Sequence, residues 1–349
     1  MSSPSTRPQA RLVQEDGKVW IAGMEKLTWQ GEQENSVMRC LAIAMQTVGR
    51  SEYTYEYLMG ISAQAFRIQL FKDGWCPSSP HARMGFNTGE VAVESLPYKL
   101  VRYEFIDEDR KNDPNARQEA YRAVAASIDR GVPALFGSEE QGLVVGYSED
   151  GGTLLGRSYM DRKKPGFKSI DKLPWGFGVL VERGATPDRR ERIIHSLKLA
   201  VKLANTESFE QYYSGWKAYE AWIAQLKDAN AFVELSAEDL KGRQFGNAYI
   251  YYCLVDARTR AAGYLKSVQA QFTGEPPAHL AKAAELYGQI TQRLSNPCPT
   301  EIAPMPGMMK EAQRWTQDMR NRQAKILEEC RSLEKQAISE IEKALALMD

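Results

Sequence analysis

A cysteine and a histidine stand five positions apart in the segment WCPSSPHA, where Cys76 precedes His81 and prolines stiffen the loop between them. A thiol within hydrogen-bonding reach of an imidazole can lose its proton and attack a thioester or an amide. The alternative is a structural loop, in which Trp75 and Cys76 pack against the core and the serines make turn hydrogen bonds. In either case, an aromatic-flanked loop of this kind is suited to form the wall of a ligand pocket.

A second segment leads from a polar loop into an apolar helix, WQGEQENSVMRCLAIAM, with Asn35 and Ser36 at the expected helix start. The N-terminus of a helix favours a thiolate or another anion because of its dipole and its unpaired N–H groups. However, the Asn-Ser pair before an apolar run predicts a helix N-cap more than an attacking Ser36 hydroxyl. Cys40 stands five residues past Asn35 among apolar neighbours, so we predict that it behaves as a small buried hydrophobic residue.

The composition excludes several classes of protein. The 349 residues suggest two domains, and the 45 basic and 45 acidic side chains favour neither a nucleic acid nor a membrane partner. The five cysteines form no CxxC pair, which predicts reduced thiols and no zinc site. No phosphate-binding loop, dinucleotide fingerprint or HExxH motif occurs, so we expect no cofactor and no metal. The polar first ten residues predict a disordered leader on a cytoplasmic protein.

Residues 11–185 are predicted to form an α+β domain, because short apolar runs alternate there with glycine and proline. The expected strands are Val19–Met24, Tyr98–Phe105, Pro133–Phe136, Gly142–Tyr147, Thr153–Arg157 and Gly176–Glu182. The expected helices are Ser36–Val48, Thr54–Leu58, Asn87–Ser95 and Ala116–Arg130. The SEDGG segment, 148–152, predicts a tight hairpin turn, because Asp-Gly supplies the positive φ that such turns need.

Residues 186–349 carry helical periodicity almost throughout and predict a helical bundle that ends in a long helix. The expected helices are Arg190–Ala204, Phe209–Lys227, Ala237–Ala270, Ala278–Leu294 and Met308–Leu347. The proline-rich loop NPCPTEIAPMPG, 296–307, predicts a break before the last helix, because proline lacks the N–H that a helix needs. We therefore place the domain boundary near residues 184–190.

Four local patterns resemble the N-terminal domain of the butirosin biosynthesis protein H family. They are the polar loop and helix from Trp29 to Ala44, YTYEYLMGISAQAFRIQL, GWCPSSPHARMGF and GLVVGYSEDG. That family is related to the bacteriocin-processing cysteine peptidases, within the papain-like α/β superfamily. The segments GWKAYEAWIAQL and NAYIYYCLVDARTRAAGYL are similar to the helical region that often follows this domain. The resemblance covers most of the chain and implies a papain-like domain followed by an all-α domain.

The resemblance implies acyl or peptide chemistry, in which a cysteine attacks, a histidine moves the proton and a polar residue orients the histidine. At the matching position of the cysteine, this chain has Asn35, with Ser36 beside it. The other matching positions hold Gln30 or Gln33 on the oxyanion side, Gln141 or Glu140 for the histidine, and Asp161 or Tyr159 for the orienting group. Asparagine cannot act as this nucleophile, and glutamine cannot carry a proton near neutral pH. The resemblance therefore implies a site without the usual catalytic pair.

We interpret the chain as a catalytically degenerate cysteine-peptidase-like protein that binds a small molecule or an acyl or peptidyl group in a cleft between its domains. The expected ligand-binding residues are Gln30, Asn35, Ser36, Trp75, Cys76, Gln141, Tyr159 and Asp161. One alternative is an active acyltransferase or amide hydrolase that uses Cys76 and His81. Another is an interaction protein that self-associates through its C-terminal helix.

Overall fold

The computed structural model describes residues 11–24, 26–27, 29, 33–148, 152–159, 167–233, 235–306 and 315–348. Several predictions fall wholly or partly outside these residues: the disordered leader 1–10, the central residues of the SEDGG turn, Gln30, Asp161, the end of the proline-rich loop 296–307 and the start of the helix predicted over Met308–Leu347. The chain forms two compact units, and each is discontinuous in sequence. Unit 1 comprises Met1–Leu58 and Leu96–Pro187, and unit 2 comprises Met59–Ser95 and Asp188–Asp349.

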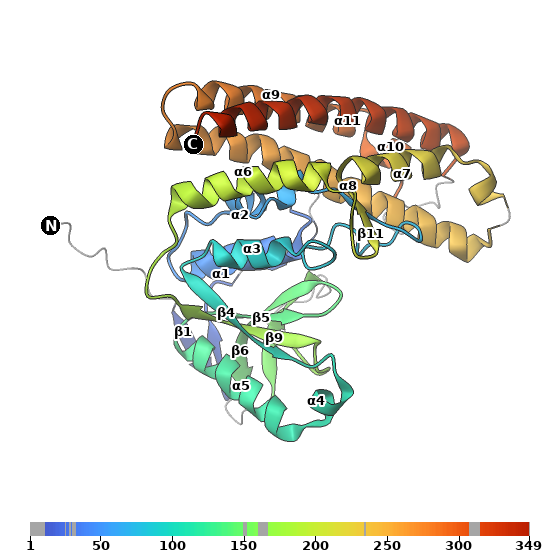
Figure 1. The fold of residues 1–349 in the computed structure, drawn as a ribbon. Coiled ribbons are helices and arrows are strands. Elements are labelled where there is room, and N and C mark those ends of the chain that lie inside the picture. The colour runs from blue at the N-terminus through green and yellow to red at the C-terminus, as the bar shows by residue number, and fades with distance from the viewer. Residues whose placement is uncertain are drawn as a thin grey trace. The chain divides into compact units, whose positions relative to one another are not determined.

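Unit 1 is built on an eight-stranded sheet whose pairings are all antiparallel (Figure 1). Six strands lie in the order β1 (Leu12–Glu15), β2 (Lys18–Ile21), β6 (Gln141–Ser148), β5 (Ala134–Gly137), β9 (Gly176–Glu182) and β4 (Tyr98–Glu104). The short strands β7 (Leu154–Arg157) and β8 (Lys168–Ser169) extend from β6. Because β6 and β7 pair antiparallel and Ser148 N–H donates to Thr153 O at 2.8 Å, the predicted hairpin is present.

Helix α5 (Pro114–Asp129) covers one face of this sheet, as Figure 1 shows. Its apolar residues Ala116, Ala120 and Val124 pack with side chains of β5, β6 and β9 in one buried cluster. Asp113 caps the helix and Pro114 occupies its first turn, where the missing proline N–H costs nothing. Helix α1 (Ser36–Thr47) packs against β6, and a short helix α4 (Glu108–Asn112) precedes α5. Helix α2 (Tyr55–Ile61) crosses from unit 1 into unit 2.

Unit 2 is mainly helical. Its helices are α3 (Thr88–Glu94), α6 (Arg189–Asn205), α7 (Gly215–Lys227), α8 (Ala237–Val268), α9 (Pro276–Ser295), α10 (Pro299–Ile302) and α11 (Gln317–Ala346), with short 3₁₀ turns at Gln64–Phe66, Asn230–Phe232 and Gln269–Gln271. Figure 1 shows α9 and α11 side by side, in agreement with their extensive contacts. The apolar stripe of α11 is used inside the unit: Leu327, Ile338 and Ile341 are buried where the helix packs on α7 and α9.

The helix predicted over Phe209–Lys227 begins later than expected. A strand β10 (Ser208–Phe209) turns through Glu210, with φ of 49°, into β11 (Tyr212–Ser214), and α7 starts only at Gly215. The tyrosines pair with β3 (Gln69–Phe71), so aromatic strand propensity and a tertiary partner override the local helical pattern. Strands β1, β3 and β8 and helix α4 were also not predicted, because each is too short to show a period.

The predicted α+β class is confirmed, with antiparallel strands in the N-terminal part and helices in the C-terminal part. The predicted boundary near 184–190 coincides with the junction at Pro187 and Asp188, but residues 59–95, predicted as part of the first domain, belong to unit 2. The last helix begins at Gln317, after residues 307–314 that lie outside the described part. Within the described residues, none of the helices has the length and apolar character required to cross a bilayer.

Candidate functional site

The start of helix α1 brings three of the predicted site residues together in unit 1. Asn35 is the N-cap: its Oδ1 accepts a hydrogen bond from Met38 N–H at 3.1 Å, and its own N–H donates to the Tyr55 hydroxyl at 3.0 Å. Ser36 follows as the first helical residue, and its Oγ accepts from the N–H of Gln141 at 3.1 Å. The start of α1 therefore contacts the start of β6, where the resemblance places a cysteine and a histidine.

The polar atoms of this contact are engaged in structural hydrogen bonds. Gln141 Nε2 donates to the carbonyl of Phe136 on β5, which fixes the side chain against the sheet. The Cys40 thiol is fully buried one turn into α1 and donates to the carbonyl of Gln141 at 3.4 Å. Cys40 thus serves the packing between helix and strand, as predicted from its apolar neighbours. Asn35, Ser36 and Gln141 supply neither a thiolate nor a proton carrier here.

Tyr159 lies near the contact between α1 and β6. Unlike the polar atoms of that contact, its hydroxyl is not satisfied. The side chain is 5% exposed, and the hydroxyl has no hydrogen-bond partner among the described residues. Burial raises the pKa of Tyr159 well above its usual range, and the nearby Cys40, Glu140 and Glu34 raise it further, so the hydroxyl keeps its proton. These neighbours place Tyr159 close to the start of both α1 and β6.

Two more buried polar atoms near α1 share this property. The indole of Trp29 stacks at a tilt on Tyr159, with ring centroids 5.3 Å apart, and its Nε1–H has no acceptor in the described part of the chain. The Oε1 of Gln33, two residues before the N-cap, is buried without a donor. Such groups are uncommon in folded proteins and call for an explanation, of which an absent ligand or water is one. We refer to Trp29, Asn35, Ser36, Gln141 and Tyr159 as the α1 cluster.

The second predicted group, Cys76 and His81, lies in unit 2 and does not form a hydrogen-bonded pair. Cys76 Sγ accepts from Ser78 Oγ at 3.0 Å, and Ser78 Oγ lies 2.9 Å from the Tyr212 hydroxyl. His81 Nδ1 instead accepts from the N–H of Arg83 at 3.2 Å. Burial, with the charges of Arg83 and Arg67, lowers the pKa of His81 to about 4. A neutral imidazole turned to the backbone does not make the thiolate–imidazolium pair of a cysteine peptidase.

The loop that carries Cys76 and His81 is held by a residue that sequence reasoning missed. Arg67 is 4% exposed, and its guanidinium donates to the main-chain carbonyls of Ser79, His81, Met84 and Phe86. Burial lowers the pKa of Arg67 to about 9. The Arg67 carbonyl in turn accepts from Arg258, which pairs with Glu334 at 2.8 Å. Isolated arginines carry no motif, so no sequence signal could have found this network.

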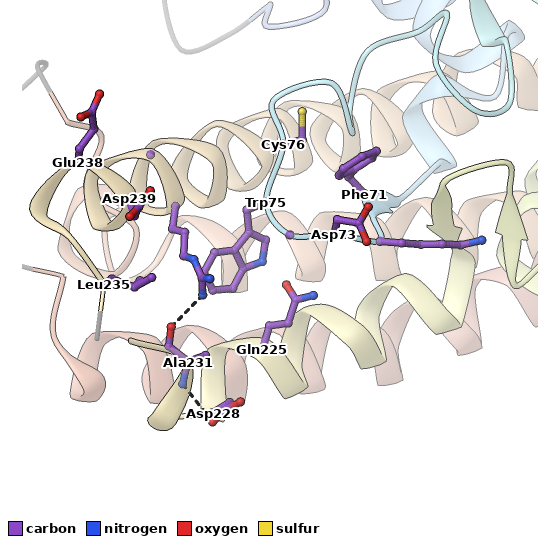
Figure 2. Close-up of a pocket in the computed structure, with 14 residues that line it drawn as sticks. Phe71, Asp73, Trp75, Cys76, Gln225, Asp228, Ala231, Leu235, Glu238 and Asp239 are labelled. Atoms are coloured by element: carbon purple, nitrogen blue, oxygen red, sulfur yellow. Dashed lines mark hydrogen bonds between the residues drawn. The ribbon is translucent and has the colours of Figure 1, made fainter. Parts of the chain in front are cut away.

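A cavity of about 760 Å³ borders the same loop in unit 2 (Figure 2). Its walls are Phe71–Cys76, the end of α7 with Asp228, and the first turns of α8. The indole of Trp75 forms part of the wall and packs on Phe232 and Trp315, with centroids 5.7 and 5.3 Å apart. A Cβ at Gly246 would come within 1.9 Å of the Trp75 carbonyl, so only glycine lets α8 lie this close to the loop. We call this the Trp75 cavity.

The predicted site residues therefore fall into two groups. Asn35, Ser36, Gln141 and Tyr159 belong to unit 1, whereas Trp75, Cys76 and His81 belong to unit 2. Among the described residues, the structure gathers no set of three histidine, cysteine, aspartate or glutamate side chains that could hold a metal ion. Comparison with known proteins assigns no family: no family model matches the chain, and no curated protein matches its sequence.

Proposed function

We propose that this chain is a binding protein with a catalytically degenerate, cysteine-peptidase-like N-terminal part, and that the α1 cluster binds a small molecule or an acyl or peptidyl group. The contact between the start of α1 and the start of β6 supports this proposal, because a papain-like site requires a helix start beside a strand start. The proposal places the ligand on unit 1 residues and does not depend on the cleft between domains that the sequence analysis predicts.

The observation that carries the proposal is the contrast within the α1 cluster. Asn35, Ser36 and Gln141 use their polar atoms for structure, whereas Tyr159 O–H and Trp29 N–H, on adjacent rings, have no acceptor among the described residues. A buried donor without a partner costs about 1–3 kcal/mol. A carbonyl or carboxylate oxygen of a ligand would accept from both donors and recover that cost. Acyl and peptidyl groups present such an oxygen.

Two observations favour binding over catalysis. The cysteine nearest to the cluster, Cys40, is buried, and its thiol is bonded to a main-chain carbonyl. Cys76 and His81, the residues of the alternative enzyme, do not form a hydrogen-bonded pair with each other. Self-association through the C-terminal helix has no support from the apolar stripe of α11, because that stripe is buried within unit 2.

Thermal denaturation of the protein with a library of acylated, carboxylate-bearing and peptidyl compounds tests the proposal. A ligand of the native state at 100 times its Kd stabilises by about 2.7 kcal/mol, which is a readily measured shift. In Tyr159→Phe the packing is kept and an unsatisfied donor is removed. We therefore expect the unliganded variant to be at least as stable as the parent, and the shift caused by the ligand to fall.

Tyr121→Phe is the matched control, since Tyr121 is a half-buried tyrosine of unit 1 that packs on Phe177 away from α1. This variant should keep the full ligand-induced shift. If no compound of the library stabilises the protein, or if Tyr159→Phe keeps the shift of the parent, the α1 cluster is not a ligand site. A loss of stability in unliganded Tyr159→Phe would show that the hydroxyl has a structural partner instead.

A further inference from the structure

The strand β4 is an edge strand of the unit 1 sheet. Among the described residues it pairs with β9 from Tyr98 to Glu104 and with no other strand, and Figure 1 shows the two strands side by side. An edge strand presents a row of main-chain N–H and C=O groups with which a further strand can pair. With seven residues, β4 offers a longer edge than β1, which has four.

The hydrogen bonds to β9 show which residues of β4 face outward. The N–H of Phe105, directly after the strand, donates to Trp175 O at 2.7 Å, in the same register as the pairs within β4 and β9. In an antiparallel pair, the main-chain groups of successive residues point alternately toward the partner strand and away from it. The odd-numbered residues of β4 therefore bond to β9, and the even-numbered residues turn their main-chain groups to the open edge.

The open part of this edge begins at Leu100. Before it, the carbonyl of Tyr98 is capped by Arg183 Nε at 3.0 Å. The main-chain N–H and C=O of Leu100 and Glu104 have no hydrogen-bond partner among the described residues. Two residues past Glu104, Ile106 exposes 71% of its surface, although its side chain is large and apolar. The edge thus combines unused main-chain groups with an apolar side chain at its end.

The side chains along this edge follow a simple order. Because side chains alternate across a strand, Leu100, Arg102 and Glu104 lie on one face, and Ile106 follows on that face when the chain stays extended. The other face carries Phe105, which belongs to the buried cluster under α5. Arg102 and Glu104 are exposed, and Leu100 is half-buried. Along the uncovered face, the order is therefore apolar, basic, acidic and apolar.

This order is complementary to itself when two such strands run antiparallel. A two-fold axis at Tyr103 sets Arg102 of each copy opposite Glu104 of the other, and Leu100 opposite Ile106. An axis at Arg102 or at Glu104 would instead set that residue opposite its own copy, and an axis at Val101 would set each charge opposite an uncharged residue. Charges on an edge strand ordinarily oppose pairing with other chains. Here their order permits pairing in one register with the same chain.

We propose that two copies of this chain pair through β4, antiparallel and about a two-fold axis at Tyr103. Main-chain hydrogen bonds join the two sheets, the two pairs of Arg102 with Glu104 fix the register, and Ile106 packs on Leu100 of the other copy. The contact is isologous, so the edge of each copy is used up and pairing stops at two copies. The inference goes beyond the proposed function, because it concerns the sheet edge and not the α1 cluster.

Sedimentation equilibrium of the full chain, from micromolar to near-millimolar concentration, tests whether the dimer forms. We expect a reversible equilibrium between monomer and dimer, without larger species. Hydrogen exchange at single-residue resolution then locates the contact. The amides of Leu100 and Glu104 should exchange more slowly as the concentration rises, whereas those of Val101 and Tyr103, which already bond to β9, should be unaffected.

Charge reversal tests the register. In a dimer of Arg102→Glu, like charges face each other across the axis, and the same holds for Glu104→Arg, so each variant should dimerise at least about tenfold more weakly than the parent. Mixed in equal amounts, the two variants should form a heterodimer, because each charge of one then faces an opposite charge of the other. Arg102→Glu combined with Glu104→Arg in one chain should restore the homodimer.

The control variant lies on β1, another edge strand of the same sheet. Glu15 is exposed there, so Glu15→Arg should dimerise as the parent does. Thermal denaturation checks that the variants fold, which is expected because all the replaced side chains are exposed.

Three outcomes would overturn the inference. A chain that stays monomeric at every concentration forms no such dimer. A dimer that Arg102→Glu leaves as tight as in the parent uses another surface. Failure of the two mixed variants to associate would show that Arg102 and Glu104 do not face each other.

Discussion

His81 is a half-buried imidazole whose pKa falls on folding, so it makes stability depend on pH. Its pKa is lowered to about 4, first by burial and then by the charges of Arg83 and Arg67, whereas an unfolded histidine titrates near about 6.5. Below about pH 6.5 the unfolded chain therefore binds a proton at His81 that the folded chain does not bind. The contribution of His81 to stability is complete above that pH and is lost as the pH falls toward about 4.

We predict that the free energy of unfolding of the parent protein falls more steeply with acidification than that of His81→Gln. Each pH unit between about 6.5 and about 4 should add at most about 1.4 kcal/mol to the difference. Denaturant unfolding at several pH values measures both profiles. Both proteins contain the same acidic groups and the same other histidines, so the contributions of these groups to the pH dependence cancel in the difference. Parallel profiles would show that His81 is protonated as easily in the folded state as in the unfolded state.

Helices α7, α8 and α11 are joined by a buried ion pair whose removal should be costly. Arg258 and Glu334 are almost fully buried at 2.8 Å, and the Tyr219 hydroxyl donates to Glu334 at 2.7 Å. Breaking such a pair leaves an unpaired buried charge and typically costs about 3–5 kcal/mol. We predict a loss of this size for Glu334→Gln, which keeps the shape of the side chain and removes its charge. Chemical denaturation measures the loss.

The control variant lies on the same helix. Glu328 pairs with Lys227 of α7, but both side chains are about half exposed, so Glu328→Gln should change stability by no more than about 1 kcal/mol. Replacing both buried partners, Arg258→Met with Glu334→Leu, should recover much of the stability lost in Glu334→Gln. If Glu334→Gln costs no more than Glu328→Gln, the buried pair does not hold the bundle together.

The periodic helices, the capped helix start and the six apolar strands bounded by glycine, proline or aspartate could be predicted from the sequence, whereas the shortest strands, which form only because of a pairing partner, could not. Asn35 is recognisable as a cap because an amide precedes an apolar run, and Asn35 does cap α1. The strand at Tyr212 was hidden because its partner, Gln69–Phe71, lies far away in sequence and is only three residues long. The helical spacing of the aromatic residues therefore predicted a helix there, but pairing with β3 makes this segment a strand.

The candidate site was only partly predictable for the same reason. The resemblance predicts that the helix start at Asn35 lies near the strand start at Gln141, and in the structure Ser36 Oγ accepts from Gln141 N–H. In contrast, the missing partner of Tyr159 depends on everything packed around it, which no local pattern encodes. The bonds from Arg258 to Glu334 and to the main chain near Arg67 join residues far apart in the chain. Periodicity and motifs carry no information about such pairs.

At the scale of the whole molecule, the chain passes from unit 1 to unit 2 and back before the long helices begin. Residues 59–95 belong to unit 2, although residues on both sides of them belong to unit 1. Unit 2 therefore needs chain segments that are separated by the whole of 96–187. Such non-local assembly slows folding, because loop closure must occur before the contacts form. The buried cysteines Cys40 and Cys330 report on unit 1 and unit 2, respectively.

Alkylation of the native protein by limiting iodoacetamide, read by peptide mass spectrometry, should follow the burial of the five thiols. We predict that the exposed Cys298 reacts first, the half-buried Cys76 and Cys253 follow, and Cys40 and Cys330 react at least about 100-fold more slowly, through opening of their units. Burial also raises the pKa of Cys330 to about 12, which lowers its thiolate fraction further. Unfolding the protein in denaturant should bring all five rates together, which is the internal control.

If Cys76 reacted faster than Cys298 and stayed reactive near about pH 5.5, its thiolate would be activated. Catalysis by Cys76 would then replace binding as the function to pursue.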